Sequence, residues 1–365
     1  MIRVDFLKMG NFMQKTVRNG KIDLMKFIFS IVVVIYHFNV GNYNYIFMKK
    51  GYIAVEFFFV TSGFLFAKSI SRINYQKETL VKDSLGFMKR KYFSLFPCHV
   101  FFFIACFIYT MFHDKWGYGD IFSHFFRSMP DFFMMQQIGL SDITLLRYEW
   151  YLSAMIIVMF ILTPLAIRYR DIFLHYICPI ICGVIIGLLY HQKSDINFTW
   201  QWTWICQAGI LRAAAEISLG CICYSFCEKG ILDRLPKILL IIIETGIYIV
   251  VLMYASNLAL RSMGDYTILI LTAAASAISF SERSSVSFLN NRFVYFLGKL
   301  SFPMYLSQLF VMEFVKPYKE AVSSPAVHTV IFVVSVIAAA LVCLAFTSDR
   351  MINAVKNISG KISNH

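Results

Sequence analysis

Two residues in the first apolar stretch of the chain have side chains that could do chemistry, Lys26 and His37. On an α-helix they share nearly one face and lie about 16 Å apart along the axis. An imidazole is the natural base near neutral pH, and an ammonium group binds an anion as a point charge. Ionisable groups inside a membrane span cost free energy and are therefore functional candidates. The alternative is that Lys26 extends to the membrane surface and His37 bonds to a neighbouring helix.

The rest of the chain supplies the helices that must position these residues. The sequence is 58% hydrophobic and only 15% charged, with a mean hydropathy of +0.64, which excludes a water-soluble globular protein. We therefore predict an all-α fold, a polytopic transmembrane helical bundle of about ten spans. Apolar stretches of suitable length predict these spans near residues 22–40, 51–71, 93–113, 148–168, 172–190, 207–227, 236–256, 265–281, 293–315 and 326–347.

The distribution of basic residues predicts how the spans are oriented. The two tails and the loops after even-numbered spans hold 22 of the 34 Lys and Arg residues, whereas the opposite loops hold 9. Because cytoplasmic segments are enriched in Lys and Arg, we expect cytoplasmic tails at 1–21 and 348–365 around a membrane domain at 22–347. The net charge of +13 follows from this bias and from anionic lipid headgroups, so no nucleic-acid partner is expected. The cysteines lie mostly within spans and are expected to be free thiols, not metal ligands.

Further polar residues lie at membrane depth and need partners. Glu56 could orient His37 through a carboxylate–imidazole hydrogen bond, or it could pair with a basic residue elsewhere. Arg212 and Glu216 are spaced i, i+4, so they can neutralise each other on one helix face. The same pair could instead line a cavity that binds a sugar or a phosphate. Trp150 is expected in an aromatic belt at the outer membrane face, or stacked on a sugar ring.

Some features suggest packing or local structure more than chemistry. Ser62 and Gly63 have small side chains that let membrane helices approach closely, with Ser62 as a covalent nucleophile being the alternative. His99, at the start of the third predicted span, could reach an inner cavity. Residues 72–92 are expected to form a basic cytoplasmic loop. Residues 114–147 carry apolar positions on a loose helical period, which predicts a short amphipathic or re-entrant helix at the outer face.

Five segments, taken together, resemble the acyltransferase-3 family of integral membrane O-acyltransferases, of the type that O-acetylates cell-envelope glycans. Their order, their spacing and the expected number of spans match that family over most of the chain. The segments are Lys26 followed by Tyr36-His37-Phe38; Gly51 with Phe57-Phe58 and Ser62-Gly63-Phe64; Lys89-Arg90-Lys91 ahead of Leu95-Phe96-Pro97; Trp150-Tyr151-Leu152-Ser153-Ala154; and Gly298-Lys299 with Tyr305-Leu306-Ser307.

This chain departs from the family pattern at four positions. Lys26 stands where the family normally has Arg, which keeps the positive charge but loses the planar fork suited to bidentate phosphate contacts. Ser94 replaces a second basic residue ahead of the proline of the third span. Met155 replaces a Glu that many members carry, and Gln308 stands where a His often follows the Tyr-Leu pair of the ninth span.

The resemblance implies an acyltransferase that moves an acyl group, expected to be acetyl, from acyl-CoA to a hydroxyl of a cell-envelope polysaccharide or glycolipid. His37 would take the hydroxyl proton. Lys26, with Arg90 and Lys91 at the inner face, would hold the phosphates of the donor. The protein is expected in a bacterial cell membrane, in contact with lipid, with no permanently bound cofactor and no metal.

A transporter or flippase of cell-envelope precursors is the alternative function. Its buried charged groups, Glu56, Arg212 and Glu216 with His37, would then form a proton- or substrate-linked path. The pairing of a cation with an imidazole eleven residues further on, beside a cytoplasmic basic cluster, favours the enzyme. The two halves of the chain also show no inverted repeat, which is a common feature of transporters.

Overall fold

The computed structural model describes residues 18–42, 47–140, 144–193, 195–257, 263–319, 321–322 and 324–347. Within these residues the chain is built of helices and connecting turns, so the predicted all-α fold is confirmed. The long helices are α1 (Gly20–Asn42), α2 (Ala54–Ile70), α3 (Leu80–His113), α6 (Trp150–Arg168), α8 (Cys178–Gln192), α9 (Ala208–Glu228), α10 (Lys237–Ser256), α11 (Asp265–Phe280), α12 (Arg292–Val315) and α13 (Pro325–Thr347). The tail expected at 348–365, and most of the tail at 1–21, lie outside the described residues.

The helices agree with a multi-pass membrane protein. Eight helical stretches in the described part of the chain are long and apolar enough to cross a membrane, one of them running from α7 (Arg170–Ile172) into α8. The shorter apolar helix α11 and the 24-residue helix α12 occupy the positions of the eighth and ninth predicted spans.

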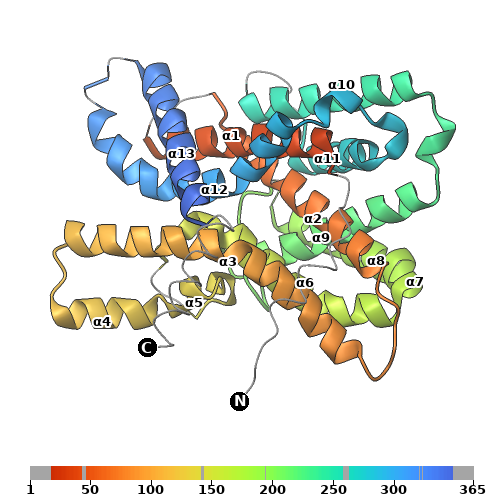
Figure 1. Cartoon of the computed structure of the whole chain (residues 1–365), viewed down its shortest axis with the longest axis horizontal. Coiled ribbons are helices and arrows are strands. Elements are labelled where there is room, and N and C mark those ends of the chain that lie inside the picture. The colour runs from red at the N-terminus through yellow and green to blue at the C-terminus, as the bar shows by residue number, and fades with distance from the viewer. Residues whose placement is uncertain are drawn as a thin grey trace, which may run out of the picture.

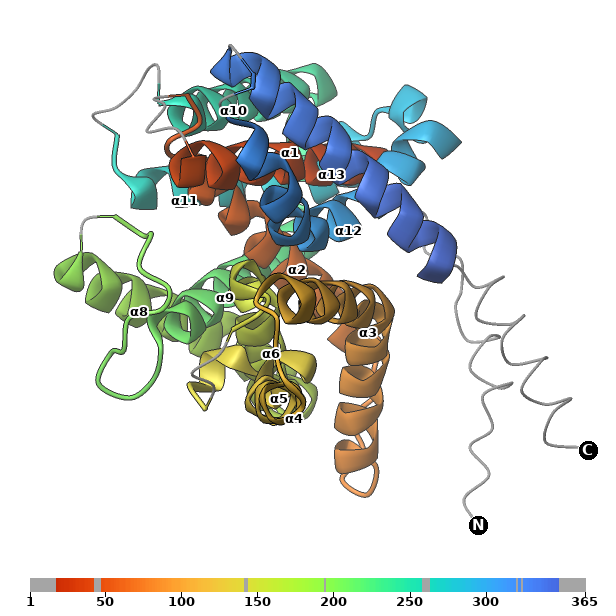
Figure 2. The same cartoon turned by 90° about the vertical axis from the view of Figure 1, so that its left-hand side faces the viewer.

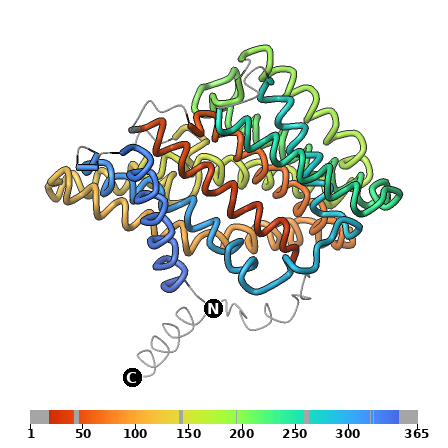
Figure 3. The backbone as a smooth tube through the Cα atoms, turned by 90° about the horizontal axis from the view of Figure 1, so that it is seen from above, coloured from red at the N-terminus to blue at the C-terminus, as the bar shows by residue number. Residues whose placement is uncertain are grey.

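Helix α2 lies at the centre of the bundle. Figures 1 and 2 show α1, α10, α11, α12 and α13 on one side of α2, and α3, α6, α8 and α9 on the other. Seen from above, α1 crosses its group between α13 and α10 (Figure 3). Helix α2 therefore lies where the two groups meet.

Helices α1 and α12 pack side by side and run parallel. Gly20, at the start of α1, lies against Leu289 just before α12, and Gly41, near the end of α1, faces Met312 near the end of α12. Helix α13 returns antiparallel to α12. The described ends of the chain, at the start of α1 and the end of α13, therefore lie toward the same end of the bundle.

Helix α3 begins earlier than the sequence predicts. It starts at Leu80, so the basic run 89–91 lies on a helix and not in a cytoplasmic loop, as predicted for 72–92. Pro97 interrupts its backbone hydrogen bonding, and α3 bends midway along its length in Figure 2, as a proline within a helix requires. The bend joins the basic half of α3 to its apolar half.

The segment after α3 folds back toward the centre of the molecule. Helix α4 (Tyr118–Arg127) runs beside the second half of α3 (Figure 1), with the rings of Phe107 and Phe125 6.0 Å apart. It confirms the amphipathic helix predicted within 114–147. Helix α5 (Met129–Phe132) and the 3₁₀ turns η3 (Gln136–Ile138) and η4 (Arg147–Glu149) follow. Irregular backbone at membrane depth is tolerated where protein surrounds it.

Helices α2 and α9 approach each other more closely than most side chains would allow. A Cβ atom added to Gly63 would overlap the carbonyl oxygen of Ile217, and one added to Gly220 would overlap that of Val60. This close contact confirms the predicted packing role of Gly63. Small residues at such crossings provide the van der Waals contact that holds membrane helices together.

We expect Gly220→Ala to lower the free energy of unfolding by about 1–3 kcal/mol, because the added methyl group must push two helix backbones apart. Thermal unfolding of the purified protein in detergent measures the change. The control is Gly183→Ala, because a Cβ atom there meets no heavy atom within 4 Å and alanine favours the helix by up to about 1 kcal/mol. Equal melting temperatures for both variants would contradict the close packing of α2 against α9.

Candidate active site

His37 is held on α1 by contacts from two other segments. Its Nδ1 lies 2.9 Å from Oε1 of Gln308 on α12. Its ring stacks on Tyr148 of η4, with 3.9 Å between ring centroids and 7° between the planes. The imidazole is half-buried, and among the described residues its Nε2 has no hydrogen-bond partner. The arrangement leaves one nitrogen of the ring free to bond to a reactant.

Three consecutive residues, where the segment that follows α4 joins α6, contact three different polar side chains. Tyr148 stacks on His37, Glu149 bonds to His99, and Trp150 covers the guanidinium of Arg212 at 5.2 Å. The backbone here is fixed as well, because the hydroxyl of Tyr305 donates to the carbonyl oxygen of Tyr148. A displacement of this segment would disturb all three centres together.

His99 forms a buried ion pair and not an accessible base. Its Nδ1–H donates to a carboxylate oxygen of Glu149 at 2.6 Å, and its Nε2–H donates to the carbonyl oxygen of Phe132 at 3.1 Å. Both partners accept hydrogen bonds, so both ring nitrogens carry a proton. Both side chains are nearly inaccessible to solvent. His99 was expected to reach an inner cavity. The structure shows instead that it links α3 to the segment between α4 and α6.

Asp131 fixes the same segment from its other end. Its Oδ2 accepts hydrogen bonds from the backbone N–H groups of Leu145 and Leu146, at 2.6 and 3.3 Å. Burial raises the pKa of the Asp131 carboxyl to about 7, and the two backbone donors offset only part of this effect. The turn that precedes η4 is thereby held against α5.

Glu56 pairs with Arg212, not with His37. The Arg212 guanidinium donates through Nη2 to Glu56, through Nε to Glu216 at 3.0 Å, and through Nη1 to the carbonyl oxygen of Ile196 at 3.2 Å. Of the two alternatives for Glu56, the structure shows the pairing with a basic residue. The imidazole of His37 already has Gln308 as its partner. The predicted i, i+4 contact between Arg212 and Glu216 is confirmed.

The Arg212 cluster carries two carboxylates against one guanidinium. The side chains of Glu56, Arg212 and Glu216 are at most 3% exposed. The second oxygens of both carboxylates, Oε2 of Glu56 and of Glu216, have no partner among the described residues. If both carboxylates are ionised the cluster carries one net negative charge, which one additional proton would neutralise. Trp150 is buried against this cluster and so does not belong to an exposed aromatic belt.

Two of the three basic residues predicted at the inner face come together. Lys26, on α1, lies 3.8 Å from Asp23, which also pairs with Arg18 at 2.8 Å. Lys91 is close enough for its charge to repel that of Lys26. Arg90 is exposed, and its guanidinium folds back along α3, so the structure does not bring it to this pair.

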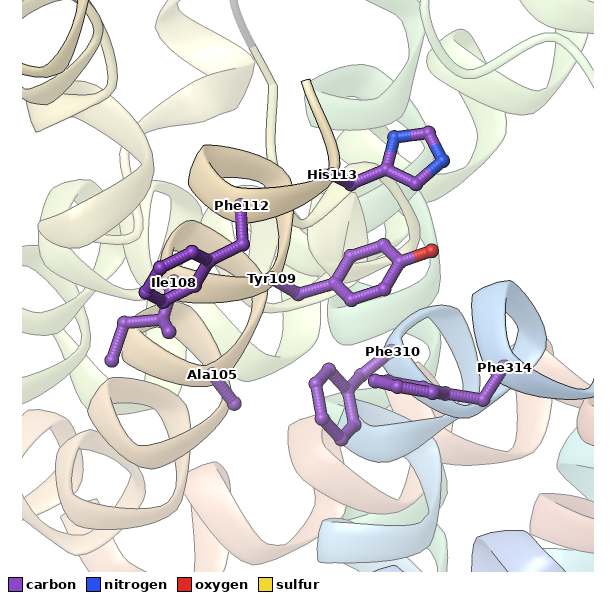
Figure 4. Close-up of a pocket in the computed structure, with 7 residues that line it drawn as sticks. All are labelled: Ala105, Ile108, Tyr109, Phe112, His113, Phe310 and Phe314. Carbon is purple, nitrogen blue, oxygen red and sulfur yellow. The ribbon is translucent and has the colours of Figure 1, made fainter. Parts of the chain in front are cut away.

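An apolar groove on the surface is separate from these residues. It holds about 510 Å³ between α3 and α12, and Figure 4 shows the rings of Phe112, Phe310 and Phe314 around it. Apart from Tyr109 and His113, its lining is apolar. Such a surface on a membrane-embedded helix pair suits the hydrocarbon tail of a lipid.

Sequence patterns did not identify the partners of His37. Gln308 was noticeable only because it differs from the family pattern, and Tyr148 lies at the edge of a predicted span, where aromatic residues are common. Glu149 gave a weak signal, since a carboxylate next to an apolar stretch usually faces water. Within the described residues, no group of three or more His, Cys, Asp or Glu side chains could hold a metal ion.

The geometry agrees with what the comparison with known proteins shows. A family model described as an acyltransferase domain matches residues 19–347. No curated protein and no solved structure matches the chain. The match includes α1 with His37, the central helix α2, and α12 with Gln308. It covers nearly the whole chain and supports an enzyme over a transporter. The protein therefore belongs to the acyltransferase-3 family and is a membrane acyltransferase.

Proposed function

We propose that the protein transfers an acyl group, expected to be acetyl, from cytoplasmic acyl-CoA to a hydroxyl of a cell-envelope polysaccharide or glycolipid in a bacterial cell membrane. The observation that carries the proposal is His37. It is a half-buried imidazole near one end of α1, with one nitrogen fixed by Gln308 and the other without a partner among the described residues. Lys26 lies near the opposite end of the same helix.

The chemistry needs a base for the acceptor hydroxyl. Nε2 of His37 takes the hydroxyl proton as the acceptor oxygen attacks the thioester carbonyl carbon. A carbon–oxygen bond forms, the carbon–sulfur bond breaks, and the CoA thiolate leaves with the electron pair. The imidazolium then returns its proton to the thiolate, which restores the neutral base and yields CoA thiol.

The inner end of α1 suits the phosphates of the donor. Lys26 and Lys91 are close enough for their positive charges to repel each other, and the Asp23 carboxylate, 3.8 Å from Lys26, offsets part of the charge of Lys26. Binding a phosphate would relieve the repulsion between the two ammonium groups. Lys26 and His37 are about 16 Å apart along α1, and the extended pantetheine arm of acyl-CoA would bridge this separation. Arg90 contributes less, because it points away along α3.

The Arg212 cluster is the proposed acceptor-binding region. The two unpaired carboxylate oxygens of Glu56 and Glu216 would accept hydrogen bonds from sugar hydroxyls, which removes the cost of leaving them unpaired. Trp150 covers Arg212 and packs against Phe59, with 5.8 Å between the ring centroids, so it fixes the cluster that the acceptor would contact. Glu56 is thus proposed to contribute to acceptor binding and not to the orientation of His37.

The general test uses purified protein and acetyl-CoA. The purified protein is expected to release CoA thiol from acetyl-CoA. In cells, mass spectrometry is expected to detect an acetyl ester on envelope glycans only when the gene is present. An acyl group of another length would show as a different mass increase. Unchanged glycans together with no thiol release would contradict the proposed donor and acceptor classes.

We expect His37→Ala to reduce acyl transfer by at least about 10²-fold, because the hydroxyl loses its base. The protein should remain inserted and folded, and the rate is measured per folded molecule. His191→Ala is the control, because His191 is exposed and outside the proposed site. Near-normal transfer by His37→Ala would remove His37 from the mechanism.

We expect Lys26→Met to weaken binding of acetyl-CoA by roughly 1.5–3 kcal/mol, the value of a charge-assisted hydrogen bond. Lys26→Arg should bind the donor at least as well as the natural protein, because it keeps the charge. Affinities are measured at matched ionic strength, with the exposed Lys89→Met as control. If Lys26 only extends to the membrane surface, Lys26→Met will bind the donor normally.

The proposed topology places both termini in the cytoplasm. We expect a reporter that works only in the cytoplasm to be active when fused to the C-terminus, and one that works only outside the cell membrane to be inactive there. The reason is that basic residues concentrate on the cytoplasmic side. In intact cells, a cysteine introduced at Lys77 should resist a membrane-impermeant reagent that labels one introduced at Lys115. The reverse labelling pattern would contradict the proposed orientation of the spans and the proposed entry of the donor from the cytoplasm.

A further inference from the structure

Gln308 is an unusual residue for its position. It lies on α12, its side chain is fully buried, and its neighbours on the same helix include the buried apolar residues Met304, Val311 and Met312. Its Oε1 lies 2.9 Å from Nδ1 of His37, whereas its amide nitrogen has no partner among the described residues. A buried N–H group without a partner costs stability. An apolar side chain of similar length would avoid that cost, so stability alone does not account for Gln308.

The contact with His37 accounts for it. In the structure the amide oxygen of Gln308 faces Nδ1, and an oxygen only accepts hydrogen bonds, so in this orientation of the amide Nδ1 carries the proton. The other tautomer would place the Nδ1 lone pair against the lone pairs of Oε1. With Nδ1 protonated, the neutral ring keeps its lone pair on Nε2, which has no partner among the described residues. Tyr148 holds the plane of the ring by stacking at 3.9 Å.

We propose that Gln308 is a positioning residue that holds His37 in its Nδ1–H tautomer and so leaves Nε2 as the base for acyl transfer. This inference rests on the proposed function, since it assigns the tautomer that the reaction uses. Gln308 is not itself a catalytic residue, because it acts through His37.

The protein contains a second histidine that shows what a different partner does. His99 faces the carboxylate of Glu149 at 2.6 Å and the carbonyl oxygen of Phe132 at 3.1 Å, so both of its nitrogens donate. It has no lone pair left for a substrate. His37 faces one neutral acceptor only, and an amide favours the imidazolium less than a carboxylate does. The choice of glutamine therefore keeps the ring neutral and able to accept a proton.

Two substitutions that nearly preserve the size of the side chain distinguish the effect of its hydrogen-bond acceptor from the effect of its volume. Gln308→Met removes the acceptor, and Gln308→Glu keeps one. We expect Gln308→Met to lower kcat by at least about 10²-fold, with the KM for acetyl-CoA unchanged, because the wrong tautomer of the catalytic histidine in a serine protease costs about 10⁴-fold. Its melting temperature should equal or exceed that of the natural protein. Gln308→Glu should restore transfer, with the acidic limb of the pH–rate profile moved to higher pH, because a carboxylate stabilises the imidazolium.

The tautomer is measured directly and without catalysis. Nitrogen-15 chemical shifts of labelled histidine, with the His37 signal assigned by its loss in His37→Ala, distinguish protonated from unprotonated ring nitrogens. We expect Nδ1–H in the natural protein and Nε2–H in Gln308→Met. Gln207→Met is the control, because Gln207 is another buried glutamine with an unpaired oxygen and should leave the His37 signal unchanged.

The two kinds of failure are distinguishable. If the natural protein does not use acyl-CoA, the proposed function fails, while the nitrogen-15 spectrum still decides the tautomer. If it transfers acyl groups but shows Nε2–H at His37, or if Gln308→Met keeps a normal kcat, the role of Gln308 is wrong. If Gln308→Met does not fold, the spectrum of the natural protein and the pH–rate profile of Gln308→Glu decide the matter.

Discussion

Burial of the Arg212 guanidinium is the constraint on which the arrangement of the helices depends. A charge removed from water at membrane depth must meet opposite charge and hydrogen-bond acceptors, or it costs several kcal/mol. Here the partners come from different parts of the chain: Glu56 from the central helix α2, Glu216 from α9 itself, the carbonyl oxygen of Ile196 from a loop, and Trp150 from α6. The close crossing of α2 and α9 is possible because glycines lie at the contact, and it brings the guanidinium within reach of Glu56.

This arrangement also determines where the irregular segment ends. Trp150 is anchored over Arg212, so the residues immediately before it lie at the same depth, with Glu149 bonded to His99 and Tyr148 stacked on His37. The candidate base is therefore connected through three neighbouring residues to the ion cluster at the centre of the bundle. The structure accounts in this way for irregular backbone between α5 and α6, since protein surrounds it and side chains fix it on several sides.

The sequence predicted features that depend on local pattern. Apolar runs identified the spans, the i, i+4 spacing identified the contact of Arg212 with Glu216, and a small residue identified the close packing at Gly63. Contacts between distant segments could not be predicted. Gln308 is 271 positions from His37, and the Arg212–Glu56 pair spans 156 positions, so no helical period relates them. The start of α3 was misplaced because basic residues suit both a loop and a polar helix turn.

His99 and His37 separate structural chemistry from reactive chemistry within one fold. A histidine whose nitrogens both donate, as His99 does to Glu149 and Phe132, gains stability by keeping its protons and holds two segments together. A base must instead gain and lose a proton in every turnover, so its partner must tolerate both the neutral and the charged ring. An amide meets that requirement because its oxygen accepts from Nδ1 in either state. The unpaired amide nitrogen of Gln308 is then the stability cost of that freedom, as expected where function and stability conflict.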